Sequence, residues 1–315
     1  MDPDRRFDFG DREGAAAYRW HMLSWRDRSR SPIHQLTDKS TFVISLQAPT
    51  LPFCASSSTR PLPALPFGIT AQYALVKPLQ AGVQYRSEVW LAVPSEIEDS
   101  HFKLNSPAAA VVFKFIVPSI RGDIPTSDLD DEGFIDGRKF VFPFDAVKGE
   151  AACYESLADF QGSTVPYFYG VHRVLMPSGE PAWILALEWI PGPPGSLYVL
   201  NKELRQGGDT KYSNYGPFMR LFHSALSTLQ SAHARNVNHA DVRAANILID
   251  EVHDQAVLID WTSDHSFSPN TRSALPVIDL RKLHHAFVTV WIEPQSSEIS
   301  RICEALDPIN TPDDS

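Results

Sequence analysis

The sequence predicts an α+β fold with two lobes, the first rich in β-strands and the second shorter and mainly helical. Short apolar runs of strand character fill most of the region before residue 190, with one amphipathic helix among them. The strongest helical stripe comes later, at residues 218–234. A polar loop and two short apolar runs follow that helix directly. This order places the loop within a mainly helical second lobe.

Length and composition favour a folded protein. The chain has 315 residues, of which 43% are hydrophobic, enough for two lobes with a real core. Its net charge is −10, and no long Lys/Arg cluster occurs, which argues against nucleic-acid or anionic membrane partners. No apolar run approaches the roughly 20 residues of a membrane span, and the N-terminus lacks an apolar signal core.

The cysteines indicate a reducing compartment. The chain has three, far apart and without a CxxC pair, so we expect free thiols rather than a disulfide framework or a zinc site. They are Cys54, Cys153 and Cys303. The expected location is intracellular and cytoplasmic, with the nucleus left open.

The first 72 residues differ from the rest. Five prolines fall between Pro49 and Pro66, around the serine run at 56–58, which is typical of an irregular linker. We therefore expect residues 1–72 to form an N-terminal extension with a Pro/Ser-rich linker, followed by lobes at 73–190 and 191–315.

Four strands and one helix are expected in the first lobe. The helix covers 149–160, with Ala152, Leu157 and Phe160 on one face and Gly162 just beyond its end. The expected strands are 84–93, 108–117, 167–175 and 182–190.

The second lobe is expected to begin with a long amphipathic helix that ends near Ala234. Its apolar stripe recurs at helical spacing, at Phe218, Leu221, Phe222, Ala225 and Leu229. Short strands are expected at 246–250 and 256–260, and a last helix at 277–290.

The loop HADVRAANILID, residues 239–250, carries polar residues at informative intervals. His239 and Asp241 are followed by Asn246, and Asp260 ends the next apolar run, in LIDWT. This spacing resembles the H-R-D-x-x-x-x-N loop and the later D-F-G of protein-kinase-like phosphotransferases. The resemblance extends over about residues 73–290. It implies that Asp241 lies beside the attacking hydroxyl, and that Asn246 and Asp260 bind Mg²⁺ with hard oxygen atoms.

The family also needs a strand lysine for the ATP phosphates, paired with a helix glutamate. In VVFK the lysine is Lys114, inside the strongest predicted strand. The predicted partner is Glu150, which opens the 149–160 helix, and Glu155 is the alternative. The two glutamates are five residues apart and point to different helix faces.

The nucleotide-binding segments of the family have weaker counterparts. AGVQYRSEVW aligns with the phosphate loop at Gly82, Gln84, Ser87 and Val89, with one of the three glycines present. Fewer glycines leave fewer backbone N–H groups close to phosphate. LALEWIPGPP resembles the hinge, in which Glu188 and Trp189 would offer backbone groups to adenine.

The sequence differs from the motifs of protein kinases at several positions. Ala240 replaces the arginine of H-R-D, and Asp260-Trp261-Thr262 replaces D-F-G. The segment up to Asp279, the candidate buried aspartate of the next helix, is short and lacks A-P-E, as in aminoglycoside- and choline-kinase-like enzymes and compact fungal protein-kinase-like proteins. Yet VRAAN, with Arg243, resembles the tyrosine-kinase loop, so Arg243 is a candidate for contact with the transferred phosphate.

The resemblance implies an ATP:Mg²⁺-dependent phosphotransferase that acts on a hydroxyl of a protein or a small molecule. Lys114, Glu150, Asp241, Asn246 and Asp260 would carry the chemistry. The alternative is a pseudokinase that serves as a binding or scaffold module, favoured by the degraded glycine loop and by Ala240. A third reading is an unrelated α+β protein in which these groups lie far apart.

Overall fold

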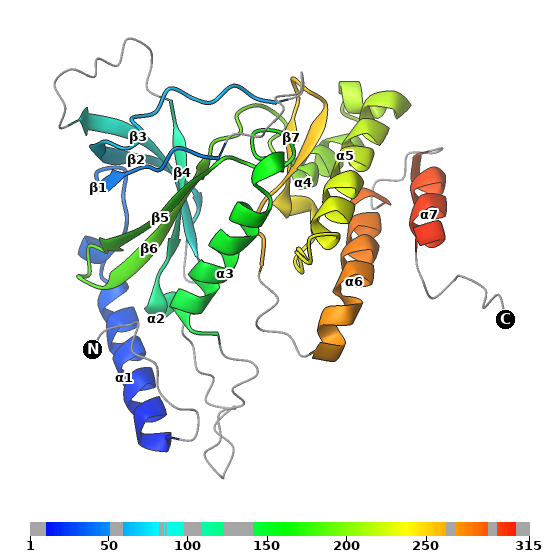
Figure 1. Ribbon diagram of the computed structural model, residues 1–315. Coiled ribbons are helices and arrows are strands. Elements are labelled where there is room, and N and C mark those ends of the chain that lie inside the picture. The colour runs from blue at the N-terminus through cyan, green and yellow to red at the C-terminus, as the bar shows by residue number, and fades with distance from the viewer. Residues whose placement is uncertain are drawn as a thin grey trace. The chain divides into compact units, whose positions relative to one another are not determined.

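Antiparallel strands and helices both build the fold, as the computed structural model shows (Figure 1). The described residues are 11–50, 59–81, 85, 87–97, 109–121, 141–262, 269–288 and 295–306. They fall into two compact units: residues 1–49, 62–151 and 167–189, and residues 50–61, 152–166 and 190–315. The first unit holds a sheet and the second is mainly helical, which confirms the predicted α+β class.

The sheet of the first unit has six strands, in the order β1-β2-β3-β4-β6-β5, and every neighbouring pair is antiparallel. The strands are β1 (Thr41–Ser45), β2 (Thr70–Gln80), β3 (Glu88–Ile97), β4 (Val111–Ile116), β5 (Phe168–Leu175) and β6 (Pro181–Glu188). Three of the predicted strands correspond to β4, β5 and β6. The strand predicted at 84–93 lies later, at β3, and the sequence analysis assigned no strand to β1 or β2.

A hydrophobic core fixes the middle of this sheet. On β4, Phe113 and Phe115 are fully buried, and their rings pack against Tyr73 and Phe42 at centroid distances of 5.4 and 5.0 Å. Because successive strand side chains alternate between faces, Lys114 points to the face opposite these two phenylalanines. The core thus sets the direction of the one lysine on this strand.

Three helices flank the sheet: α1 (Arg12–Ser29), α2 (Pro118–Arg121) and α3 (Pro143–Ser156). The side chain of Asp11 caps α1 by accepting the N–H of Gly14 at 3.0 Å. Arg26 of α1 donates to the Ser119 carbonyl at 2.9 Å, which ties α1 to α2. No helix was predicted within residues 1–72, so α1 is an element that the sequence analysis missed.

Two predicted helices have different limits in the structure. The helix predicted at 149–160 is α3, which begins at Pro143, so Glu150 lies within the helix and does not open it. Proline at a first helical position is common because its missing N–H has no partner there anyway. The helix predicted at 277–290 is α6 (Pro269–Val288), which continues through Pro276. Prolines usually stop helices, which is why the prediction began after it.

Glu180, beside β6, is a buried carboxyl that makes the stability of the first unit depend on pH. It is 1% exposed and accepts the N–H and the hydroxyl of Ser119 at 2.7 and 2.6 Å. Burial raises the pKa of Glu180 to about 7, although the Ser119 hydrogen bonds and the Arg26 charge act in the opposite direction. Between its unfolded pKa and about 7, the folded state therefore binds more protons than the unfolded chain.

We expect the free energy of unfolding to lose up to about 3 kcal/mol from this group as the pH rises from about 4.5 to 7. Glu180→Gln keeps an acceptor and a donor for Ser119 but does not ionise. Urea unfolding at pH 5 and pH 8 should show that the variant gains stability relative to wild type at pH 8. Glu155→Gln, the same change at an exposed position of α3, is the control and should show no such gain. An equal difference from wild type at both pH values would contradict the prediction.

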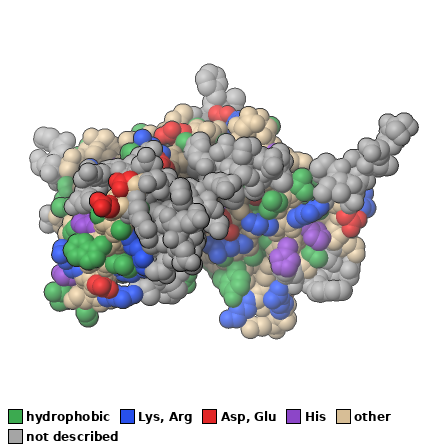
Figure 2. All heavy atoms as spheres, turned by 90° about the horizontal axis from the view of Figure 1, so that it is seen from below, with side chains coloured by type: hydrophobic (Ala, Val, Ile, Leu, Met, Phe, Trp, Pro, Cys, Tyr) green, Lys and Arg blue, Asp and Glu red, His purple; other side chains and the backbone are tan. Residues whose placement is uncertain are grey.

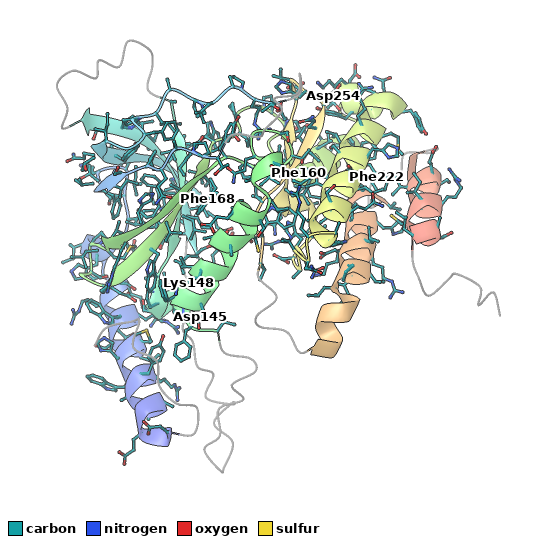
Figure 3. All side chains as sticks on the ribbon, viewed as in Figure 1. Asp145, Lys148, Phe160, Phe168, Phe222 and Asp254 are labelled. Carbon is teal, nitrogen blue, oxygen red and sulfur yellow. The ribbon has the colours of Figure 1, made fainter. Side chains whose placement is uncertain are left out.

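In its described residues, the second unit contains the four α-helices that follow residue 190 and a two-stranded hairpin. The helices are α4 (Leu197–Arg205), α5 (Tyr215–His233), α6 and α7 (Gln295–Leu306), and the hairpin is β7 (Ile247–Asp250) with β8 (Gln255–Leu258). The stripe predicted for α5 is its buried face. Phe222, labelled in Figure 3, and Phe218 both pack edge-on against Phe287 of α6, at 5.4 and 5.7 Å. Among the described residues, no helix combines the length and the apolar character needed to cross a membrane.

Candidate functional site

A buried ion pair occupies the first unit. The Nζ atom of Lys114, on β4, donates to both carboxylate oxygens of Glu150, on α3, at 2.6 Å each. The two side chains are only 8% and 7% exposed. Glu155, the alternative partner, is exposed. Lysine and glutamate are almost never buried unless they are paired, so this arrangement fixes the position of the ammonium group.

Other predicted nucleotide contacts of the first unit already have partners within the chain. The Ser87 carbonyl and hydroxyl accept from Gln80 Nε2 at 3.0 and 3.4 Å. The Glu188 N–H donates to the Tyr167 carbonyl at 2.8 Å, so this donor is not available to an adenine in the arrangement observed. Trp189 has the Lys77 ammonium 5.5 Å from its ring centre. Val89 lies opposite Lys114 in the β3–β4 register, and Gly82 lies outside the described residues.

The second unit brings four of the predicted residues together. Asn246 Nδ2 donates at 3.0 Å to both the carbonyl and the Oδ2 atom of Asp241. Arg243 Nε lies 3.2 Å from the same Oδ2 atom, and Arg243 also reaches within 4.0 Å of an Asp260 oxygen. The Asp241 and Asp260 side chains are 45% and 36% exposed, so both carboxylates remain accessible to solvent. The group therefore has two carboxylates, one amide and one guanidinium.

Asp279 of α6 holds the backbone that carries Asp241. Its fully buried carboxylate accepts the N–H groups of His239 and Ala240 at 2.8 and 2.9 Å. Lys282, one turn later, donates to the Ala240 carbonyl at 2.6 Å. Ala240 has φ +62°, a left-handed conformation that costs a residue with a Cβ about 1–2 kcal/mol. These contacts compensate for that cost.

We expect Asp279→Asn to lower the free energy of unfolding by about 2 kcal/mol. The amide keeps one acceptor oxygen but turns an NH₂ donor toward a backbone donor, so one of the two N–H groups loses its partner. Urea unfolding measures the loss, and faster hydrogen exchange at the amides of residues 239 and 240 locates it. Asp159→Asn, at a side chain that is 65% exposed, is the matched control. Unchanged exchange at these two amides would contradict the predicted role of Asp279.

His239 serves the loop as a buried neutral ring. It is fully buried, and within the described part of the chain neither ring nitrogen has a hydrogen-bond partner. Burial lowers the pKa of His239 despite the nearby aspartates, which keeps the ring uncharged at neutral pH. Its ring packs against Trp261 at a centroid distance of 4.7 Å. Trp261 thus links the loop to the segment after β8.

The donor atoms of this group fit a small hard cation. Asp241 and Asp260 offer carboxylate oxygens, and Asn246, whose Nδ2 faces Asp241, has its amide oxygen left to act as a ligand. Such oxygens suit Mg²⁺, which usually keeps only one or two carboxylates and completes its shell with phosphate and water. Among the described residues, no cluster of three or more His, Cys, Asp or Glu side chains could hold a metal on its own. Arg243 places a competing positive charge beside both carboxylates.

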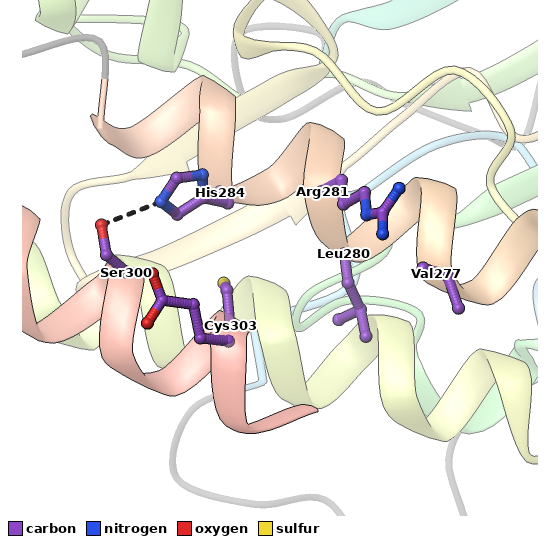
Figure 4. A pocket seen from close by; sticks show the side chains of 7 residues that line it. Val277, Leu280, Arg281, His284, Ser300 and Cys303 are labelled. Atoms are coloured by element: carbon purple, nitrogen blue, oxygen red, sulfur yellow. Dashed lines mark hydrogen bonds between the residues drawn. The ribbon is translucent and has the colours of Figure 1, made fainter. Parts of the chain in front are cut away.

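A small cavity of about 110 Å³ lies apart from these residues, between α6 and α7 (Figure 4). His284 Nε2 and Ser300 Oγ lie 2.9 Å apart at its edge, and Cys303 points into it. Burial and the charge of Glu304 raise the pKa of the Cys303 thiol to about 11, so the thiol is protonated at neutral pH. Cys303 is therefore not a thiolate nucleophile at neutral pH.

Comparisons with protein-family models and with curated proteins found no match. Among solved structures, the BubR1 kinase domain is similar with a TM-score of 0.43 and 13% identity, over 90% of this chain and 76% of that one. A MAP kinase from Leishmania major, LmaMPK10, has a TM-score of 0.43 and 14% identity, over 69% and 55% of the two chains.

Rad53 1-466, solved in complex with AMP-PNP, has a TM-score of 0.43 and 10% identity, over 69% of this chain and 47% of that one. The matches thus span about half the length of LmaMPK10 and of the Rad53 chain. Similarity at this level assigns no role to any residue of this chain.

Proposed function

We propose that the chain is an ATP:Mg²⁺-dependent phosphotransferase that moves the γ-phosphate of ATP to a hydroxyl acceptor. The observation that carries the proposal is the group in the second unit: Asp241 is held by Asn246 and Arg243, and Asp260 lies next to the same arginine. Two solvent-accessible carboxylates beside an amide are suited to orient a hydroxyl and to bind a cation. The buried Asp279 keeps the backbone of this group in place.

Each residue has a role in the proposal. Asp241 would accept the proton of the acceptor hydroxyl. The hydroxyl oxygen would bond to the γ-phosphorus while the bond between the γ-phosphorus and the β–γ bridging oxygen breaks, which leaves ADP. Asn246 and Asp260 would hold Mg²⁺, which when bound neutralises phosphate charge. Arg243 would stabilise the transferred phosphate. In the first unit, Lys114 would contact the ATP phosphates from the position that Glu150 gives it.

The adenine and phosphate contacts of the proposal are weaker. Gly82, Ser87 and Val89 would cover the phosphates, and Glu188 and Trp189 would contact the adenine. Because the Glu188 N–H is already bonded to Tyr167, its carbonyl or the Trp189 backbone would have to serve. These partners inside the chain favour a second candidate, a pseudokinase that binds a partner without phosphoryl transfer. Arg243, which lies where a cation would approach both carboxylates, favours it too.

Calorimetry with ATP, in Mg²⁺ and in EDTA, tests the proposal. Wild type should bind ATP only with Mg²⁺, and Asp260→Ala should weaken binding by at least about tenfold, because a metal ligand is lost. Lys114→Ala should do the same. Asp38→Ala and Lys39→Ala, the same changes at exposed positions, are the controls. Folding of each variant is checked by circular dichroism.

Absence of ATP binding to folded wild-type protein would contradict the enzyme proposal and leave the pseudokinase candidate. Binding that survives in Asp260→Ala would remove this residue from the metal site.

A further inference from the structure

A second cavity, of about 440 Å³, lies beside the Asp241 loop and is lined by basic and neutral residues. Its lining residues come from α4 and the turn after it, from the loop, and from α6; the basic ones are Lys202, Arg205, Arg243, Lys282 and His285. Among the residues that the structure describes, no Asp or Glu lines it, although the chain has a net charge of −10. Figure 2 shows Lys, Arg and His side chains close to one another on part of the face that it presents.

The cavity has a fixed framework. Asn201 is 4% exposed and donates from Nδ2 to the Ala286 carbonyl at 2.9 Å, so it joins α4 to α6 at the lining. Val242 and Ala286, also in the lining, are buried. Lys282 is held by its hydrogen bond to the Ala240 carbonyl. Several charges thus surround a site whose walls are packed.

Helix electrostatics explain only part of this charge. Lys202 and Arg205 lie in the last turn of α4, where cations are favourable for the helix dipole. The same effect applies to His285, in the last turn of α6, but it does not account for Lys282 or Arg243, which reach the same cavity from α6 and from the loop. Like charges that converge from separate elements repel one another, and an anion in the cavity would relieve this repulsion.

Arg243 connects the cavity to the proposed chemistry. It lines the cavity, and its Nε atom also lies 3.2 Å from Asp241 Oδ2. Only the Arg243 side chain would therefore separate an anion bound in the cavity from the Asp241 carboxylate. We infer that the acceptor is a small hydroxyl compound that already carries a phosphate group, and that this cavity binds that phosphate. The inference rests on the proposed function and adds the substrate class.

The volume and the donors favour a phosphorylated small molecule over a peptide. Small-molecule sites typically measure about 300–1,000 Å³, a range that includes this cavity. A phosphate dianion accepts several charge-assisted hydrogen bonds at once, and arginine matches its geometry with two parallel donors. Tyr198, Val242 and Ala244 add an apolar portion to the lining for the rest of such a molecule.

The test measures anion binding without ATP. Calorimetry compares glycerol 3-phosphate, glycerol and an Asp/Glu-rich peptide on the full chain. We expect glycerol 3-phosphate to bind and glycerol not to bind. The double variant Lys202→Gln/Arg205→Gln, both on the exposed side of α4, should bind glycerol 3-phosphate about tenfold more weakly. Lys39→Gln/Arg301→Gln removes two exposed charges elsewhere and should bind like wild type.

Mg²⁺-ATP binding to the same double variant separates this inference from the proposed function. Unchanged ATP binding with weakened glycerol 3-phosphate binding supports the acceptor role of the cavity. Loss of ATP binding in the double variant would overturn it, because the cavity would then hold the nucleotide. No glycerol 3-phosphate binding to a wild type that binds ATP, or tighter binding of the peptide, would overturn it too. If wild type binds glycerol 3-phosphate but not ATP, the cavity remains an anion-binding site, and the phosphotransferase proposal is contradicted.

Discussion

Asp241→Asn is expected to lower the rate of phosphoryl transfer by about 10²–10⁴-fold while Mg²⁺-ATP binding persists. The neutral amide cannot accept the proton of the attacking hydroxyl. It keeps an oxygen that can accept from Asn246 Nδ2 or Arg243, so the loop should retain its shape. Because ATP hydrolysis takes water as the acceptor, ADP release can be measured before the natural acceptor is known.

The matched control for this prediction is Asp38→Asn, the same change at an exposed position in the other unit. It should leave ADP release unchanged. Circular dichroism and calorimetry on Asp241→Asn separate a chemical defect from a folding defect. Wild-type turnover in a folded Asp241→Asn protein would show that Asp241 is not the catalytic carboxylate. Its roles in the loop would then be structural.

Local patterns in the sequence predicted the elements that position the loop. The stripe at Phe218, Leu221 and Phe222 is the buried face of α5, since helical spacing reports burial directly. The apolar run around Lys114 is the central strand β4, because a strand buried on both faces reads as a continuous apolar run. The polar residues Asp241 and Asn246 do lie together, since only a short turn separates them.

Elements that depend on distant partners escaped prediction. In α1, Tyr18 and Met22 are buried while Trp20 is 71% exposed. The positions of the apolar residues therefore did not indicate which face of a helix would be buried. Arg60, in the segment expected to be an irregular linker, forms a buried ion pair with Asp250, 190 residues later. Such contacts leave no periodic signal in either segment.

The basic cavity was missed for the same reason. Its charges come from Lys202 and Arg205, from Arg243, and from Lys282 and His285, three short segments that are far apart in sequence. Each segment alone reads as an ordinary solvated helix or loop face. The nearest signal was the pair of basic clusters at 202–205 and 281–285, which only the packing of α4 and α6 places on one cavity.

Lys114→Met is expected to lower the free energy of unfolding by about 3–5 kcal/mol, in addition to the weaker ATP binding that the proposed function predicts. The change removes the ammonium that donates to both oxygens of Glu150 and leaves that buried carboxylate without this cation. The physical reason is that a buried charge without its counter-charge is unfavourable. This free-energy cost is larger than the net stabilisation that the ion pair itself provides.

A double-mutant cycle in urea unfolding tests this explanation. Lys114→Met/Glu150→Gln should recover much of the loss, since the carboxylate charge is then absent, and the coupling energy should be about 1–3 kcal/mol. Lys39→Met, at an exposed position, should change stability by no more than about 0.5 kcal/mol. A double variant as unstable as Lys114→Met would show that the loss comes from the packing of the lysine stem. The pair would then matter for the position of the ammonium rather than for the stability of the sheet.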